Sequence, residues 1–253
     1  MRPLSVGIVV SLVGTLLAGS VGLGSAADPK AIIERGLAAA GGKLSDQARS
    51  STWKEKGTFH AMGQEIFFTS SWHIAPPGQY RFDLESTNLP IRLVFVLSGD
   101  QAWQGASGMV EEVRGEKLAY AKNQAHQFWV TSLYPLLEKP GFRLALAGEA
   151  DVEGKPAVGV RVSHTGQDDI TLYFDKGSGL LVKLETLVMD EFSGWAKVKS
   201  EAFFQDYYKQ GERMVFRKLK VLRDGKLMIE SEMSEPRYHE QLDEKLFEKP
   251  EGN

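Results

Sequence analysis

The sequence predicts a mainly β protein with helices, an α+β chain in which about ten or eleven antiparallel strands form one sheet. Three observations favour this fold class. Apolar and polar residues alternate over much of the chain, glycine-containing turns separate the alternating stretches, and two segments have apolar residues at helical spacing. A sheet of this length curls, and the two amphipathic helices are the material available to cover its apolar face.

Residues 1–27 have the order of a secretory signal peptide. A positive charge at Arg2 precedes a long apolar run, and small residues occupy the −3 and −1 positions before Asp28. We therefore expect cleavage near Ala27, export to a bacterial periplasm or to the exterior, and a single domain over residues 28–253. The alternative is an uncleaved membrane anchor, although the apolar run is near the lower limit of ~17–25 residues for a membrane span.

Composition narrows the function classes. The chain has 30 Lys and Arg against 33 Asp and Glu, a net charge of −3, so it offers no basic surface for nucleic acid or for an anionic membrane. It has no cysteine, which excludes disulfides, thiolate metal sites, cysteine nucleophiles and lipid attachment through an N-terminal cysteine. Stability must therefore come from a packed core, which a chain of this length can bury.

The mature chain is predicted to begin with a helix, in the segment DPKAIIERGLAAAGGKL. Asp28 can cap the helix and Pro29 suits its first position, where no backbone donor is needed. Isoleucines, Leu37 and alanines recur at helical spacing, and the pair Gly41-Gly42 predicts the end of the helix.

Strands are predicted wherever the period changes to two. Clear examples are residues 80–84, 89–97, 158–162 and 170–174, in which apolar side chains take every second position. The turn DKGSG leads into a further apolar stretch, and Gly211 and the segment RDGK separate the last strands. Such a pattern is typical of a meander in which one face is dry and the other wet.

A second helix is predicted in the middle of the chain, in GEKLAYAKNQAHQFWVTSLYPLLEK. One face of it is predicted to carry Leu118, Ala121, Ala125, Phe128, Trp129 and Leu133. Pro135 should end or kink the helix, because proline lacks the backbone donor and clashes with the preceding turn.

No catalytic or metal-binding motif is apparent in the sequence. The five histidines are not at metal-ligand spacing from one another, and we expect neither a metal nor another cofactor. Aromatic residues are the remaining signal, since they crowd the first half of the chain. They suit either a plain β core or the wall of an apolar cavity beneath the helices, and the pattern alone leaves both readings open.

Two stretches carry a family resemblance. They are SWHIAPPGQYRFDLES, with Trp72, Pro76 and the Tyr80-Arg81-Phe82 strand, and LVFVLSGDQAWQG, which ends near Trp103. Together with the closing segment QLDEKLFEKPEG and the hairpin DITLYFDKGSGLLVKLE, their order resembles the LolA family, the periplasmic carriers of lipoproteins.

The resemblance implies a half-open antiparallel β-barrel with a helical lid and an apolar interior that holds acyl chains. The residues it suggests for ligand binding are Trp72, Tyr80, Phe82, Phe95 and Trp103 in the wall, and Phe128 and Trp129 in the lid. Lipoprotein carriers of this family have an arginine directly before the proline, which latches the lid, whereas this chain has Ala75 there. The resemblance therefore leaves open whether the protein shuttles its ligand or senses it.

Our functional hypothesis is an exported, non-enzymatic carrier or sensor that binds lipid or lipoprotein acyl chains. We expect a monomer that does not bind nucleic acid, with envelope membrane proteins as further partners. Two alternatives come from other classes. One is a protein–protein interaction module of the cell envelope with a filled core, and the other is a hydrolase whose catalytic residues converge from distant strands.

Overall fold

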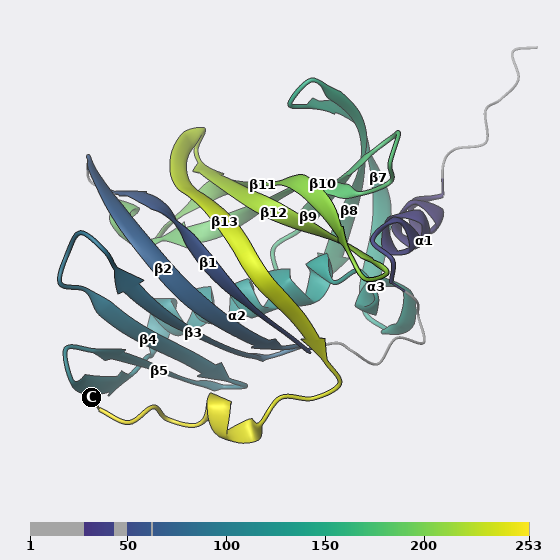
Figure 1. Ribbon diagram of the computed structural model, residues 1–253. Coiled ribbons are helices and arrows are strands. Elements are labelled where there is room, and N and C mark those ends of the chain that lie inside the picture. The colour runs from purple at the N-terminus through teal and green to yellow at the C-terminus, as the bar shows by residue number, and fades with distance from the viewer. Residues whose placement is uncertain (1–27, 43–49, 62, 253) are drawn as a thin grey trace, which may run out of the picture.

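The computed structural model describes residues 28–42, 50–61 and 63–252 (Figure 1). The expected signal peptide, residues 1–27, lies outside the described residues, so its cleavage stays a prediction.

The described strands form one antiparallel sheet of 13 strands, in the order β6-β5-β4-β3-β2-β1-β13-β12-β11-β10-β9-β8-β7. Their bounds are β1 Ser50–Ala61, β2 Gln64–Ala75, β3 Gln79–Ser86, β4 Arg92–Ser98, β5 Gln101–Ala106, β6 Met109–Glu112, β7 Phe142–Val152, β8 Lys155–His164, β9 Ile170–Asp175, β10 Leu181–Asp190, β11 Ala196–Gln210, β12 Arg213–Arg223 and β13 Lys226–His239.

The mainly β fold class is confirmed, but the expected count of about ten or eleven strands is wrong. The additional strands include β6, whose four residues are too few to show an alternating pattern. The strand expected over residues 89–97 is also shorter than predicted. It begins at Arg92, because residues 87–91 form a bend stabilised by the hydroxyl of Ser86, which accepts a hydrogen bond from the Leu89 amide.

The connections explain how the sheet is covered. The first strand, β1, pairs with the last strand, β13. Strands that follow one another in sequence are neighbours in the sheet, with one exception: β6 and β7 are consecutive in sequence but form the two edges of the sheet. The chain must therefore cross from one edge to the other between them, and it does so as α2 (Gly115–Thr131) and α3 (Pro135–Glu138). Figure 1 shows α2 lying along the sheet behind β1, β2 and β13.

The helices follow the sequence signals closely. α1 spans Pro29–Ala39, and the side chain of Asp28 accepts a hydrogen bond from the Lys30 amide at 2.9 Å. The helix expected in mid-chain is interrupted near the proline: α2 stops at Thr131, and Pro135 opens the short α3.

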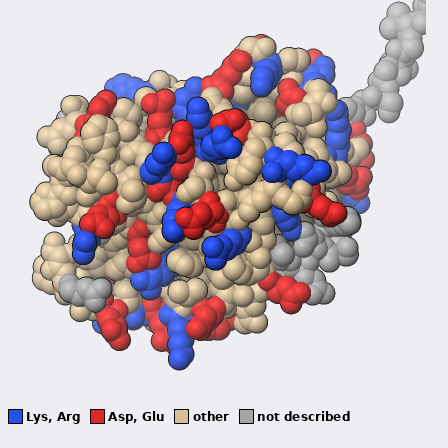
Figure 2. Space-filling view, viewed as in Figure 1, with Lys and Arg blue, Asp and Glu red and all other residues tan. Residues whose placement is uncertain are grey.

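The outer face of the sheet is polar and mixed in charge. Figure 2 shows lysines, arginines and carboxylates interspersed over the face that is turned away from α2. Cross-strand ion pairs, such as that between Lys56 and Glu232, lie there. The C-terminal segment runs back along this face, and η2 (Glu244–Phe247) packs against β3 and β4 with Phe247 buried. The closing segment thus covers an apolar part of the outer face.

Candidate functional site

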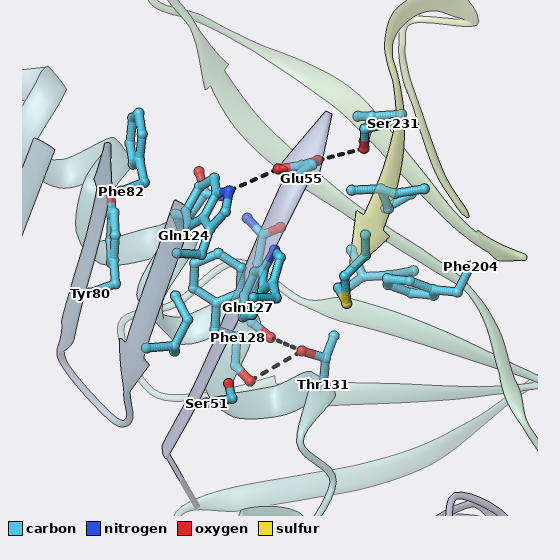
Figure 3. Close-up of a pocket in the computed structure, with 18 of the residues that line it drawn as sticks. Ser51, Glu55, Tyr80, Phe82, Gln124, Gln127, Phe128, Thr131, Phe204 and Ser231 are labelled. Atoms are coloured by element: carbon cyan, nitrogen blue, oxygen red, sulfur yellow. Dashed lines mark hydrogen bonds between the residues drawn. The ribbon is translucent and has the colours of Figure 1, made fainter. Parts of the chain in front are cut away.

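A cavity of about 710 Å³ lies between the concave face of the sheet and the helices (Figure 3). Its walls come from β1 to β4 on one side and from β10 to β13 on the other, with α2 along the open side and the C-terminal end of α1 at one end. The volume falls within the range of about 300–1,000 Å³ that is typical of small-molecule sites.

One wall is a row of aromatic rings that crosses four strands. Trp53, Trp72, Phe82 and Phe95 are successive cross-strand partners in β1 to β4, so their side chains lie on the same face. The ring centroids of Trp72 and Phe82 are 4.7 Å apart, and those of Phe82 and Phe95 are 5.7 Å apart. Phe128 of α2 meets this row edge-on, with its ring centroid 5.7 Å from that of Trp72.

The other wall is mostly aliphatic. Leu184, Ala202, Val221 and Ile229 are successive cross-strand partners in β10 to β13, and all four line the cavity. Because period-two alternation places every second residue of each strand on the concave face, the two rows lie on the same face of the sheet.

Five of the seven residues expected at the site line the cavity: Trp72, Tyr80, Phe82, Phe95 and Phe128. Trp103 does not, since it pairs with Val96, which lies on the outer face of β4, whereas the next residue, Gln104, pairs with Phe95 and does line the cavity. The predicted wall residue is thus one position away from the residue that lines the cavity, and neighbouring residues of a strand point to opposite faces of the sheet.

Trp129 also lies outside the cavity lining. Neighbouring helical residues point about 100° apart, so Phe128 enters the cavity while Trp129 points toward the far edge of the sheet. There its ring centroid lies 5.2 Å from that of Phe142 and 6.3 Å from that of His126. Trp129 therefore joins α2 to β7 and β8 instead of lining the cavity.

Two carboxylates line the cavity, Glu55 and Glu191, and the sequence analysis singled out neither. Glu55 of β1 accepts hydrogen bonds from the Trp72 indole at 2.8 Å, from the Ser70 hydroxyl at 3.2 Å and from the Ser231 hydroxyl. The signal was available, because strand alternation places Glu55 on the same face as Trp53. The flanking Lys54 and Lys56 made the stretch resemble a solvated charged strand.

Side-chain contacts at two places hold the lid helix α2. Arg223 at the end of β12 donates a hydrogen bond to the Tyr120 hydroxyl at 3.1 Å and also pairs with Asp190. On the other side of the helix, Lys122 pairs with Asp100 in the turn between β4 and β5 at 2.6 Å. Ala75, at the position of the family's latch arginine, ends β2 and takes no part in these contacts.

Burial lowers the pKa of a histidine in the helix seam, the contact of α2 with Phe142 of β7 and His164 of β8. His126 of α2 is buried against Phe142 and His164, with its ring centroid 5.4 Å from that of His164. Desolvation, with a smaller contribution from the nearby His164, lowers the pKa of His126 to about 4. The imidazole is therefore neutral at pH 7 and acts as part of the packed seam.

Apolar side chains remain exposed where the cavity meets solvent. Ile91 lines the cavity and is still 40% exposed. Phe192, in the turn after β10, is 45% exposed, and its ring centroid lies 5.8 Å from that of the cavity residue Phe59. These residues mark an apolar rim at the end of the cavity that holds the β3–β4 and β10–β11 turns.

Solved structures of other proteins share this fold. A LolA superfamily protein from Nitrosomonas europaea has a TM-score of 0.59 and 9% identity, with 88% of this chain and 99% of that chain covered. A structure described as an outer membrane lipoprotein-sorting protein domain from Vibrio parahaemolyticus has a TM-score of 0.54 and 11% identity, with 87% and 95% covered.

A DUF1329 family protein from Desulfovibrio piger has a TM-score of 0.56 and 14% identity, with 88% of this chain and 98% of that chain covered. No protein-family model and no curated protein matches the sequence. The LolA-like fold expected from the sequence is therefore confirmed, at identities that show the fold alone.

Among the described residues, no helix is both long and apolar enough to cross a membrane.

Proposed function

We propose that the protein is an exported, non-enzymatic carrier or sensor that binds the acyl chains of a lipid or lipoprotein in its cavity. The observation that carries this proposal is the largely apolar cavity beneath α2, with an aromatic row on one side and an aliphatic row on the other. Each methylene group that leaves water for such a surface contributes about 0.8 kcal/mol, so one acyl chain suffices for useful affinity.

The hollow interior favours a carrier over an interaction module with a filled core. A filled core would leave the rings of Trp72, Phe82 and Phe95 packed on both sides, whereas here they face the cavity. The names of the structural neighbours, a LolA superfamily protein and a lipoprotein-sorting domain, support the same class. The expected signal peptide supports action in the periplasm, where envelope membrane proteins would load or receive the ligand of a monomeric carrier.

The first test is binding of a neutral fluorescent lipid probe to the mature chain and to an Ala202→Phe variant. Ala202 lies in the aliphatic wall, so a phenyl ring there occupies space that an acyl chain would use. We expect the probe to bind the wild type and to bind the variant at least tenfold more weakly. Lipid that co-purifies from a periplasmic preparation, identified by mass spectrometry after organic extraction, would name the natural class.

Ala145→Phe is the matched control, because Ala145 is exposed on β7 and lies outside the cavity lining. It should bind the probe like the wild type. Equal binding by the wild type and Ala202→Phe, with both folded, would show that the cavity is not the binding site. Absence of binding by the wild type, together with no extractable lipid, would refute the carrier proposal.

A further inference from the structure

Glu55 is a carboxylate on the sheet side of a largely apolar cavity. It lies on β1 between Trp53 and Gly57, and its direct cross-strand partners are Ser70 and Met233. Figure 3 shows Glu55 between the aromatic side of the cavity and Ser231. A charge in such surroundings is costly unless it is paired or fully hydrogen-bonded.

The described residues supply hydrogen bonds to this carboxylate but no ion pair, although Lys117, Arg213 and Arg223 also line the cavity. The three donors, from Ser70, Trp72 and Ser231, are all neutral. No ion pair joins Glu55 to a cationic side chain within residues 28–42, 50–61 and 63–252. Lys54 and Lys56 point to the outer face and pair with carboxylates of β13 there.

The count of acceptor positions leaves room for one more donor. A carboxylate has about four acceptor positions on its two oxygens. Two donors, from Ser70 and Trp72, use Oε2, but only the Ser231 hydroxyl uses Oε1. Glu55 lines the cavity and is half-buried, so a ligand in the cavity could donate a hydrogen bond to the free position on Oε1.

Further polar groups of α2 line the same cavity. Gln124 and Gln127 do so together with Phe128, one helical turn apart (Figure 3). Gln127 donates to Asn123 at 2.6 Å, which keeps its carbonyl oxygen available as an acceptor. The cavity thus combines two apolar sides with a central strip that contains hydrogen-bond acceptors and the carboxylate of Glu55, which pairs with no cation among the described residues.

We infer that the ligand carries a positively charged N–H donor, an alkylammonium group, which pairs with Glu55 while its hydrocarbon chain occupies an apolar side of the cavity. This inference rests on the proposed function, because it specifies the polar group of the amphiphile that the cavity binds. An ammonium would supply the charge that the site lacks and would fill the free position on Oε1 by a charge-assisted hydrogen bond. A fatty-acid carboxylate would instead meet a like charge.

The test compares three amphiphiles with the same chain, hexadecylamine, hexadecanol and hexadecanoic acid, each below its critical micelle concentration at pH 7. Affinity is measured by displacement of a neutral fluorescent lipid probe. For the wild type we expect the amine to bind at least tenfold more tightly than the acid, with the alcohol between them. In Glu55→Gln, which keeps the size and an acceptor but removes the charge, the amine should lose at least tenfold and the alcohol should change less than threefold.

Glu230→Gln is the matched control, since Glu230 is exposed on the outer face of β13, next to Ser231 in sequence, and the substitution makes the same change in net charge. It should retain the preference for the amine. Thermal unfolding checks that both variants are folded, and Glu55→Met, which also removes the charge, provides a second variant if Glu55→Gln is not.

The outcomes separate the two proposals. If the alcohol binds but the amine and the acid bind equally well, or a folded Glu55→Gln or Glu55→Met variant leaves the preference for the amine unchanged, the ammonium inference is wrong and the carrier proposal survives. If none of the three amphiphiles binds the wild type, the carrier proposal itself fails.

Discussion

The two ends of the sheet curve in the same way but are used differently. At the end formed by β8 to β10, α1 and α3 fill the concave face with a core that includes Ile33, Leu136 and Leu172. At the end formed by β2 to β5, α2 packs a second core that includes Leu97 and Ala125, and the cavity lies beside this core. The same strand pattern therefore produces a filled end and a hollow end, where a core and the cavity lie next to each other.

The size of the side chains on the helices accounts for the difference. At the filled end, α1 approaches the sheet so closely that a Cβ on Gly36 would lie 2.5 Å from the Phe174 ring. At the hollow end, α2 packs its small residues Ala121 and Ala125 into the core, while Phe128 extends into the cavity and contacts the aromatic row edge-on. Close packing requires side chains that interdigitate from both sides, and at the filled end α1, α3 and Val130 of α2 supply them.

The largest expected effect distinguishes the two ends by stability. Leu172→Ala, at a fully buried position of the filled end, should lower the free energy of unfolding by about 3 kcal/mol, within the usual range for such truncations. Phe82→Ala, in the cavity wall, should cost about 1–2 kcal/mol, because that ring already borders empty space and has fewer contacts to lose.

Chemical denaturation and probe binding measure the two variants side by side. Leu172→Ala should keep the affinity of the wild type at temperatures where it is folded, whereas Phe82→Ala should lose tenfold or more, about 1.4 kcal/mol. The comparison between a structural end and a binding end would be wrong if Leu172→Ala weakened binding and Phe82→Ala did not.

A smaller effect concerns pH at the seam where α2 meets the filled end. Because the pKa of His126 is about 4 in the folded protein and near 6.5 when unfolded, the unfolded state binds more protons between these values. Stability from the neutral imidazole is therefore present above pH 6.5 and is lost as the pH falls toward 4. The expected loss is about 1–2 kcal/mol, reduced by solvent screening.

Denaturation of the wild type and His126→Gln at several pH values isolates this effect from that of the carboxylates. The difference in free energy of unfolding between the two should shrink as the pH falls from 6.5 to 4. A difference that stays constant over this range would show that His126 has an ordinary pKa.

The smallest effect sharpens the role of the lid contact. Tyr120→Phe removes the hydroxyl that accepts a hydrogen bond from Arg223, while Arg223 keeps its pairing with Asp190. We expect a loss of about 1 kcal/mol in stability and a faster release of the probe in stopped-flow experiments, because α2 is held less tightly at that point.

The exposed pair of Lys122 with Asp100 provides the control for the lid contact. Lys122→Ala should change release little, since exposed ion pairs contribute little. Faster release from Lys122→Ala than from Tyr120→Phe would place the more important lid contact at the β4–β5 turn.

Much of the fold follows from local patterns in the sequence. Alternation in residues 80–84 and 170–174 placed strands there, the Asp28-Pro29 pair placed the start of α1, and Pro135 placed the interruption of the second helix. These features depend on neighbours within one or two turns, which is why the sequence alone reveals them.

Placement on a face was predicted less well where it depends on one residue of register. Trp103 and Trp129 share the aromatic character of cavity residues, but a shift of one residue reverses the face of a strand and turns a helical side chain by about 100°. The pairing of Trp103 with Val96 exists only in the assembled sheet, so composition does not predict it.

The sequence by itself determined that this is a cysteine-free, mainly β chain with helical cover and an aromatic-rich first half, because composition and period are local properties. Only the tertiary structure decided that β1 pairs with β13, which brings Ser231 to Glu55 across 176 positions of sequence. It also decided that α2 spans the sheet over a cavity. The physical reason is that pairing and packing join residues far apart in the chain, so their geometry exists only once the whole sheet has curled.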